Sequence, residues 1–256
     1  MFGRELLEIN EVFGPTVQGE GAAAGRHCLF LRVANCNLEC AWCDTAYTWA
    51  FSKTKAEKTI SGKVYDKSEN VKQMTDLQVI DALLGLWDIE NKPTIIVVSG
   101  GEPMMQQYKL IPLLRRLRMM GNEVHIETAG TIKPHADFDQ YVNQYNVSPK
   151  LHHSNNRQSK RFKPEALEFF ANSNKAWFKF VVMPHAGMDG QDFWEVDEMV
   201  GEFRIDPRHV MIMPEGKTVE GTLDCARTWS TMALNRGYGI SFRTHILLWP
   251  EIERGR

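Results

Sequence analysis

The chain has 256 residues, a net charge of −2 and 43% apolar residues. This length and composition are ordinary for one sizeable α/β domain with a substantial core. The near-neutral charge argues against a nucleic-acid binder, and the lack of any 18-residue apolar run argues against a membrane span. Residues 1–6 lack the apolar region of a signal peptide, so we expect a reducing, cytoplasmic location. The most basic segment, residues 157–163, is expected to be a solvated loop.

Residues 5–13 alternate in polarity and predict an opening strand, which Gly14 and Pro15 should end because proline cannot continue a ladder. A glycine-flanked loop follows at residues 18–21, and residues 28–33 predict the next strand. Residues 50–73 are polar, carry six lysines and show no apolar period. They predict a mobile excursion from the fold.

A capping box at Thr75 and Gln78 begins a predicted helix, whose apolar positions repeat at helical spacing up to Trp87. Apolar runs and amphipathic segments then alternate to the end of the chain. In order, the expected elements are strand 94–98, helix 104–120, strands 123–128 and 141–147, helix 164–171, strand 177–182, helix 191–202, strand 209–213, helix 218–235 and an extended tail through Trp249.

This alternation predicts βα units and a mainly parallel sheet. We expect a single α/β domain over residues 1–256, with the polar insert at about 50–73 and a C-terminal extension at about 240–256. In such sheets, ligands gather at the carboxyl ends of the strands. The loops that follow predicted strands, and that should therefore meet at one edge, are residues 36–43, 99–103, 148–150 and 213–216.

Three of the five cysteines, Cys36, Cys40 and Cys43, are spaced C-x3-C-x2-C. No disulfide framework fits three close cysteines in a long chain, so the spacing indicates a metal or an iron–sulfur cluster. A [4Fe–4S] cluster takes four thiolates, so three local ones leave one position open for a reactive ligand. The residues alone leave two alternatives, a cluster and a zinc site completed by His27 or Cys28.

The C-x3-C-x2-C loop resembles the cluster loop of radical S-adenosylmethionine (SAM) enzymes. Residues 13–21, which read FGPTVQGEG, and residues 36–45, which read CNLECAWCDT, together resemble the 7-carboxy-7-deazaguanine synthase family. The resemblance covers nearly the whole chain and is to the longer-tailed branch. It implies a partial (β/α) barrel of mainly parallel strands, with an inserted loop after the cluster motif.

The resemblance implies roles for individual residues. Cys36, Cys40 and Cys43 would hold the [4Fe–4S] cluster, and Thr45 would bind Mg2+, with substrate and water oxygens completing the octahedron. Residues that would bind SAM are Trp42, Gly101, Glu102, Ser148, Pro149, Lys150, Met213 and Pro214. Residues that would bind substrate are Val17, Gln18, Gly19, Glu20, Arg32 and Ser99. Additional candidates at the site are Glu127, Arg243 and His245; a terminal role is not assigned to Arg256.

The implied reaction begins with reductive cleavage of SAM. The resulting 5′-deoxyadenosyl radical takes a hydrogen from 6-carboxy-5,6,7,8-tetrahydropterin, the ring contracts, ammonia leaves and 7-carboxy-7-deazaguanine forms. The cofactors are the cluster, SAM and Mg2+, and the partners are the pterin and an electron donor such as flavodoxin or ferredoxin. A homodimer that binds neither nucleic acid nor membrane is expected. The alternatives are a radical SAM activase acting on a partner protein and a non-enzymatic zinc-binding module.

Overall fold

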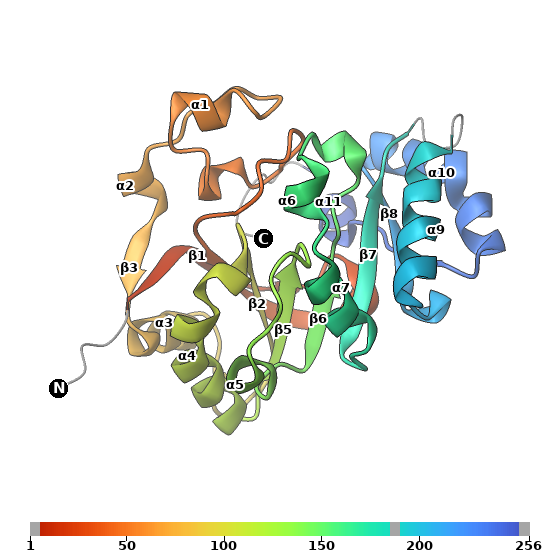
Figure 1. Ribbon diagram of the computed structural model, residues 1–256. Helices are drawn as coiled ribbons and strands as arrows, with labels where there is room; N and C mark the ends of the chain where they lie inside the picture. The colour runs from red at the N-terminus through yellow and green to blue at the C-terminus, as the bar shows by residue number, and fades with distance from the viewer. Residues whose placement is uncertain (1–5, 185–189, 251–256) are drawn as a thin grey trace.

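The computed structural model describes residues 6–184 and 190–250. One nine-stranded sheet organises them, with the strand order β3-β1-β2-β4-β5-β6-β7-β8-β9. From β2 onward all neighbours are parallel, whereas β1 is antiparallel to both β2 and β3. The strands are β1 Leu7–Val17, β2 His27–Val33, β3 Lys72–Met74, β4 Ile95–Gly100, β5 Glu123–Thr128, β6 Gln144–Val147, β7 Ala176–Val182, β8 Val210–Pro214 and β9 Gly239–Ile240. This open sheet of sequential parallel strands confirms the predicted fold class (Figure 1).

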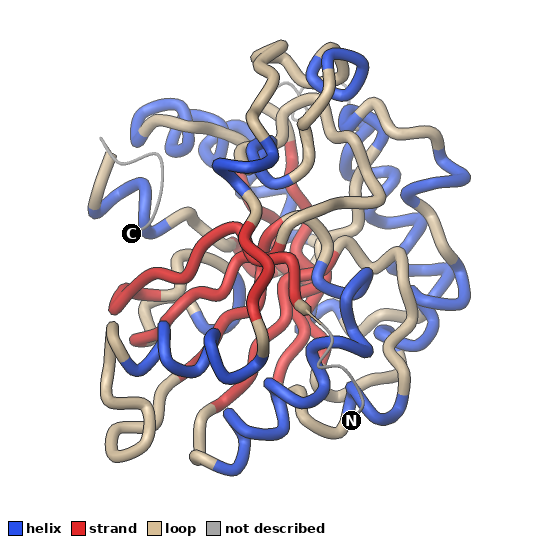
Figure 2. Tube along the Cα trace, turned by 90° about the vertical axis from the view of Figure 1, so that its left-hand side faces the viewer, coloured by secondary structure: helices blue, strands red, loops and turns tan. Residues whose placement is uncertain are grey.

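Helices and loops surround the sheet, which lies as one twisted layer in the middle of the molecule (Figure 2). The α-helices are α1 Lys53–Ala56, α2 Lys67–Asn70, α3 Asp76–Leu84, α4 Gln107–Met119, α5 Ala136–Asp139, α6 Gln158–Arg161, α7 Pro164–Ala171, α9 Gln191–Phe203, α10 Val219–Asn235 and α11 Thr244–Leu248. Short 3-10 helices are η1 Gly21–Ala23, η2 Ala46–Thr48, η3 Pro103–Gln106, η4 His152–Ser154 and η5 Pro207–His209. No helix within these described ranges combines the length and the apolar character that a membrane crossing needs.

The two faces of the sheet differ in chemistry because successive strand residues point to opposite sides. We call one face the outer face: its alternate apolar residues, such as Leu31, Val98 and Phe180, form the main core together with the helices. The opposite face is called the inner face. On the inner face, a second apolar cluster forms from residues that include Cys28 and Val97. The inner residues nearer the carboxyl ends are polar instead: Arg32, Ser99, Glu127, Asn146 and Lys179. The fold therefore places polar chemistry at the carboxyl edge of the inner face.

Strand β1 does not end at Gly14 and Pro15 as predicted, but continues to Val17. A register shift between Phe13 and Thr16 marks a bulge at this point. Because β3 pairs only with residues 7–9, the proline lies where β1 has a free edge and needs no ladder hydrogen bond on that side. The predicted stop was wrong because proline is tolerated at a bulge on an edge.

The segments at residues 50–73 and 240–249 also differ from prediction. The insert contains α1 and α2, each begun by a side-chain cap, from Ser52 and Asp66 respectively. The tail is not extended, since α11 follows the short strand β9. These helices have only four or five residues, which is too short for an apolar period to reveal. The basic segment is not wholly solvated either, because Arg161 is buried and pairs with Glu195.

Candidate active site

The cysteine loop follows β2 directly and gathers its three thiols. Cys36 and Cys43 pack against a buried cluster that contains Cys40, Leu38 and Ala129. Neighbouring groups donate to all three sulfurs: Leu38 N lies 3.4 Å from Cys36 Sγ, Asn156 Nδ2 lies 3.2 Å from Cys40 Sγ, and Trp49 Nε1 lies 3.3 Å from Cys43 Sγ. Burial raises the pKa of Cys40 to about 11. Donors directed at ligand sulfurs are the outer contacts that orient a metal centre.

The donor set fits a cluster and not the zinc alternative. His27 and Cys28 begin β2, whereas the cysteine loop follows its far end, so about 17 Å of strand separates them from that loop. A tetrahedral zinc site would also need sulfurs about 3.8 Å apart. In the described ranges, no three His, Cys, Asp or Glu side chains are grouped to hold one ion. Three thiolates that each bind a different iron of a cluster need not meet at one point.

The end of β4 packs directly against the cysteine loop. A Cβ at Gly100 would lie 2.0 Å from the Val33 carbonyl oxygen, and one at Gly101 would lie 1.8 Å from that of Asn35. Only glycine permits this approach of two backbones. The neighbouring Glu102 N donates to the same Asn35 oxygen at 2.8 Å. The two glycines therefore fix where the loop stands relative to β4.

Glu102 is fully buried, so the expected contact of its carboxylate with the amino group of SAM needs correction. Its carboxylate already accepts hydrogen bonds from Met104 N at 3.1 Å, Thr128 Oγ1 at 2.9 Å and Ala129 N at 2.8 Å. Burial raises its pKa, and these three donors oppose that rise. Glu102 ties β4 to β5 beneath the cysteine loop and presents no accessible oxygen.

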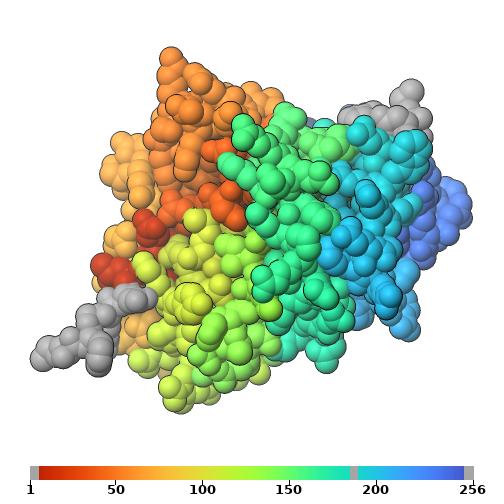
Figure 3. All heavy atoms as spheres, viewed as in Figure 1, coloured from red at the N-terminus to blue at the C-terminus, as the bar shows by residue number. Residues whose placement is uncertain are grey.

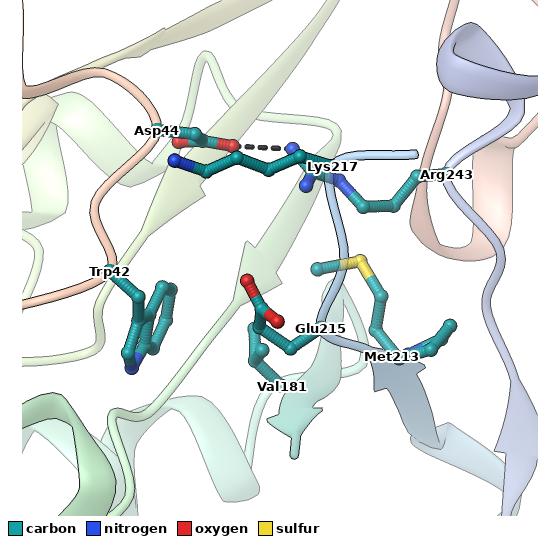
Figure 4. Close-up of a pocket in the computed structure, with 8 residues that line it drawn as sticks. Trp42, Asp44, Val181, Met213, Glu215, Lys217 and Arg243 are labelled. Carbon is teal, nitrogen blue, oxygen red and sulfur yellow. Dashed lines mark hydrogen bonds and ion pairs between the residues drawn. The ribbon is translucent and has the colours of Figure 1, made fainter. Parts of the chain in front are cut away.

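The other residues expected at SAM gather above the strand ends. Lys150 Nζ donates to Ser148 Oγ at 2.8 Å and lies 5.7 Å from the centre of the Trp42 ring, with Pro149 between Ser148 and Lys150 in the chain. Across from Trp42, Met213 and Pro214 line a small pocket of about 30 Å³ (Figure 4). Trp42 Nε1 donates to His153 Nδ1 at 2.9 Å, which fixes the indole. Residues from the cysteine loop, the segment after β6 and the end of β8 thus share one mouth.

A network of buried charges occupies the inner face below this mouth. Lys179 Nζ lies 2.5 Å from Glu20 Oε2 and 3.1 Å from Glu127 Oε2. Gln18 Nε2 and Asn146 Nδ2 both donate to Glu127 Oε1, at 3.0 Å and 2.8 Å. Burial alone would lower the pKa of Lys179, but the two carboxylates raise it above its usual range. The arrangement is a buried cation held between two partly buried anions.

The C-terminal tail closes over the same network. Arg243 donates from Nε to Glu20 Oε1 at 3.1 Å, from Nη1 to the Gly216 carbonyl at 2.8 Å and from Nη2 to Asp44. Burial would raise the pKa of Glu20, yet Lys179, Arg243 and His245 together hold it far below its usual range. A Cβ at Gly19 would lie 2.1 Å from His245 Nδ1. Arg243 and His245, which the sequence left open, therefore stand at the site.

Arg32 and Ser99 are aligned across the parallel pair of β2 and β4. Glu11 Oε1 accepts from Arg32 Nε at 2.6 Å, and the guanidinium lies over the rings of Phe13 and Tyr47. Within the described part of the chain this bond uses only one edge of the guanidinium. Val17 pairs with His27 at the opposite end of β2, so the structure does not bring it together with Arg32.

Sequence reasoning missed Lys179 and Asn146. Each is a polar residue in a strand whose neighbours are apolar, and this was a signal that could have found them. A buried polar residue in a parallel strand needs a partner. Glu127 of β5 accepts from both residues, and Glu20 in the loop after β1 also accepts from Lys179.

Residues 17–167, more than half of the chain, match a family described as a 4Fe-4S single cluster domain. A 7-carboxy-7-deazaguanine synthase from Pyrobaculum aerophilum is 33% identical and covers 95% of each chain. The protein of that name from Escherichia coli K12 is 29% identical over 93% of this chain and 96% of its own. The crystal structure of QueE from Escherichia coli gives a TM-score of 0.65 at 25% identity, covering 94% of this chain and 95% of that one.

Proposed function

The chain belongs to the 7-carboxy-7-deazaguanine synthase family of radical SAM enzymes, and from this premise we propose how its residues serve that reaction. The function is that of a radical SAM lyase of 7-deazapurine (queuosine-type) biosynthesis, which converts 6-carboxy-5,6,7,8-tetrahydropterin to 7-carboxy-7-deazaguanine with loss of ammonia. One observation carries the assignment of roles. The thiols of Cys36, Cys40 and Cys43, called the cysteine nest below, and the charged inner face open onto the same edge of the sheet.

Cys36, Cys40 and Cys43 hold the cluster in this proposal, and the cluster with SAM supplies the radical chemistry when both are bound. Gly101 contributes to the SAM site because its lack of a side chain lets the end of β4 pack against the backbone of the cysteine loop. Trp42, Ser148, Pro149, Lys150, Met213 and Pro214 form the walls that orient SAM and exclude water. Glu102 holds the end of β4 in place beneath the SAM site through its hydrogen bonds to Thr128 and Ala129.

The inner face binds the pterin. The aminopyrimidinone edge of a pterin presents N–H donors beside a carbonyl acceptor, and the face offers carboxylates at Glu20 and Glu127 beside the ammonium of Lys179. Gln18 supplies an amide from the same loop, and Gly19 allows the backbone to lie close to the ligand. Charged groups held in place before the substrate arrives need little reorganisation during the reaction.

The pterin carboxylate binds at Arg32, whose hydrogen bond to Glu11 is made by Nε and therefore does not use the terminal nitrogens. Ser99 stands beside it across the strand pair. A guanidinium with one edge held by a protein carboxylate can offer its other nitrogens to a second carboxylate. Val17, the last residue of β1 and the partner of His27 at the start of β2, contributes to the shape of the loop.

Mg2+ binds next to this carboxylate through Thr45. Thr45 Oγ1 lies 3.6 Å from Cys43 Sγ, so a cation there would stand beside the cluster. Mg2+ keeps several waters and takes few protein oxygens, so one hydroxyl suffices where a substrate carboxylate supplies another oxygen. The ion would orient the substrate and stabilise negative charge during the rearrangement.

The remaining parts of the proposal concern the setting of the enzyme. The free thiols of all five cysteines support a reducing, cytoplasmic location. An external one-electron donor such as flavodoxin or ferredoxin is required, because the described side chains offer no redox group other than the cysteine nest. A homodimer follows from the family resemblance alone.

Anaerobic turnover tests the function. The reconstituted protein is incubated with SAM, dithionite, Mg2+ and the carboxypterin, and the products are identified by mass. We expect 7-carboxy-7-deazaguanine and ammonia in equal amounts, with SAM regenerated. Reductive loss of SAM without any change in the pterin would contradict the proposal and favour the activase alternative, in which a partner protein is the substrate.

A further inference from the structure

The lysine-rich insert lies directly against the cysteine loop. Ile60 N donates to the carbonyl of Ala41, between Cys40 and Cys43, at 2.8 Å. Tyr65 N donates to the carbonyl of Ala50 at 3.1 Å. In Figures 1 and 3 the segment around α1 stands out as a projection at the top of the molecule. The insert is thus a surface feature attached by its backbone to the site.

A short chain of contacts leads from this surface to a thiol. The Tyr65 ring packs against a buried cluster formed by Ala46, Trp49 and Ala50, and Cys43 packs against the same cluster. Trp49 completes the connection, since its Nε1 donates to Cys43 Sγ at 3.3 Å. One indole therefore separates a half-buried surface ring from a sulfur of the cysteine nest.

The insert is basic while the rest of the chain is acidic. Residues 50–73 carry six lysines and three acidic residues, a net charge of +3, so the whole-chain charge of −2 leaves −5 on the remainder. Five of these lysines are exposed, and between them Ile60 and Val64 have 79% and 50% of their surface exposed. The six lysines are Lys53, Lys55, Lys58, Lys63, Lys67 and Lys72. An apolar centre with a charged rim is the usual anatomy of a protein interface.

We propose that the lysine-rich insert, residues 50–73, is the docking surface for a small acidic one-electron carrier protein. It rests on the proposed function, because that function requires an electron at the cluster. In the step, one electron passes from the reduced carrier to the oxidised cluster, so the carrier is oxidised by one electron and the cluster is reduced by one. No bond forms or breaks in this transfer. Complementary charge would attract the carrier to the insert. Because Trp49 connects Tyr65 to Cys43, the carrier would bind next to Tyr65.

An acidic protein fits this surface better than the other polyanions a basic patch attracts. A nucleic acid would be bound by charge alone and would leave the exposed Ile60 and Val64 without a partner. Weak electron-transfer encounters use small interfaces, so a single insert of this size is sufficient. Electrostatic steering acts mainly on the association rate and weakens with salt.

Paired charge reversals test the proposal on the reconstituted enzyme. The test variant is Lys58→Glu with Lys63→Glu, which flank Ile60. The matched control is Lys92→Glu with Arg115→Glu, which makes the same charge change on exposed residues away from the cysteine loop. Lys63 and Lys92 each lie over an aromatic ring, those of Tyr65 and Trp87, so each variant loses one such contact. The probe is an acidic flavodoxin.

Two measurements are made at low salt: the Kd for oxidised flavodoxin, and the rate at which reduced flavodoxin bleaches the cluster. For the test variant we expect about a tenfold or greater fall in the rate and a weaker Kd, both shrinking as salt rises. The control should change by less than about twofold. Reduction by dithionite should be equal in all three proteins, because a small reductant needs no docking surface.

Equal losses in both variants, or no loss in the test variant, would overturn the proposal. So would a loss of RNA binding in the test variant while flavodoxin reduction stayed unchanged. Failure of the proposed function is a separate result: the unaltered enzyme would then not convert the pterin even with dithionite. The binding and bleaching measurements remain readable in that case.

Discussion

The two faces of the central sheet bury side chains of opposite chemistry at neighbouring positions of one strand. In β7, Phe180 points outward and is fully buried in the main core, while Lys179, one residue earlier, points inward and is buried between two carboxylates. The outer side chain stabilises the fold by removing apolar surface from water. The inner one bears a desolvation penalty that its ion pairs must offset.

This difference shows where stability has been exchanged for function. Buried ion pairs are often no more stable than apolar residues of the same volume, so a buried cation on the inner face is weak support for the fold. The inner face of the amino half shows that apolar packing was available, since Cys28 and Val97 cluster there. The buried cation Lys179 and its two carboxylate partners lie toward the carboxyl half, where a ligand would use them.

The largest effect is expected at the cysteine nest. Cys40→Ala should abolish cluster-dependent cleavage of SAM, because one of three iron ligands is lost. The measurements are iron content and 5′-deoxyadenosine formation under anaerobic conditions. The matched control is Cys28→Ala, which removes a thiol from the apolar half of the inner face and should retain activity. Full 5′-deoxyadenosine production by Cys40→Ala would refute the ligand assignment.

The contrast between the two faces is sharpest at Lys179. Lys179→Met leaves the carboxylates of Glu20 and Glu127 facing each other without their shared cation, and it should lower the free energy of unfolding by roughly 3–5 kcal/mol. Urea unfolding measures the change. Adding Glu127→Gln removes one of the two charges and should recover part of the loss.

Phe180→Ala is the comparison on the outer face. It should cost about 3–5 kcal/mol through lost packing, and Glu127→Gln should not rescue it. If Glu127→Gln failed to rescue Lys179→Met, or rescued both variants, the two faces would not differ in the way described.

A smaller effect is expected at Thr45, at the carboxyl edge of the sheet beside the cysteine loop. Thr45→Ala should raise the Mg2+ concentration needed for half-maximal product formation on the order of tenfold, the loss expected from about 1.4 kcal/mol. The control is Thr45→Ser, which keeps the hydroxyl and should respond to Mg2+ almost normally. An unchanged Mg2+ titration in Thr45→Ala would remove this residue from the metal site.

The smallest effect concerns His125 on the inner face, where Nδ1 is buried and has no hydrogen-bond partner among the residues that the structure describes. Burial lowers its pKa, although Glu123 opposes the shift. The unfolded chain then binds the proton more readily, so this contribution to stability is present above about pH 6.5 and is lost as the pH falls toward the folded pKa. His125→Phe should flatten the fall in unfolding free energy between pH 7 and pH 5, by at most about 1.4 kcal/mol per pH unit. Urea unfolding at several pH values checks this, and a slope as steep as that of the unaltered chain would contradict it.

The sheet was predictable because its strands are short, continuous apolar runs such as residues 95–98. Such runs are typical of parallel strands that are covered on both faces. Helices of eight or more residues also carry enough turns for their apolar period to show. The four- and five-residue helices α1, α2 and α11 do not, and tertiary contacts decide their conformation. The bulge in β1 was hidden for a related reason, since a proline is excluded only where a neighbouring strand needs its N–H.

The candidate site was predictable where the chemistry depends on spacing along the chain. Cys36, Cys40 and Cys43 are such a case, because a loop of eight residues can carry all three ligands. The contacts of Lys179 and Arg243 with Glu20 are not, because they join residues 159 and 223 positions apart in the chain. Only the fold reveals that these charges meet, and an isolated lysine in an apolar strand was the one signal of it.

The closing contact between α11 and the first loop has a consequence for how the enzyme is made. Gly21 N donates to Ser241 Oγ, and Glu20 pairs with Arg243, across 220 and 223 residues of chain. During synthesis the parallel strands can assemble in order as they emerge, but the pocket mouth must wait for the last helix. A ribosome-bound chain stalled before Arg243 would carry the parallel strands with an unfinished entrance, so ligand capture would begin only once this segment had emerged and folded.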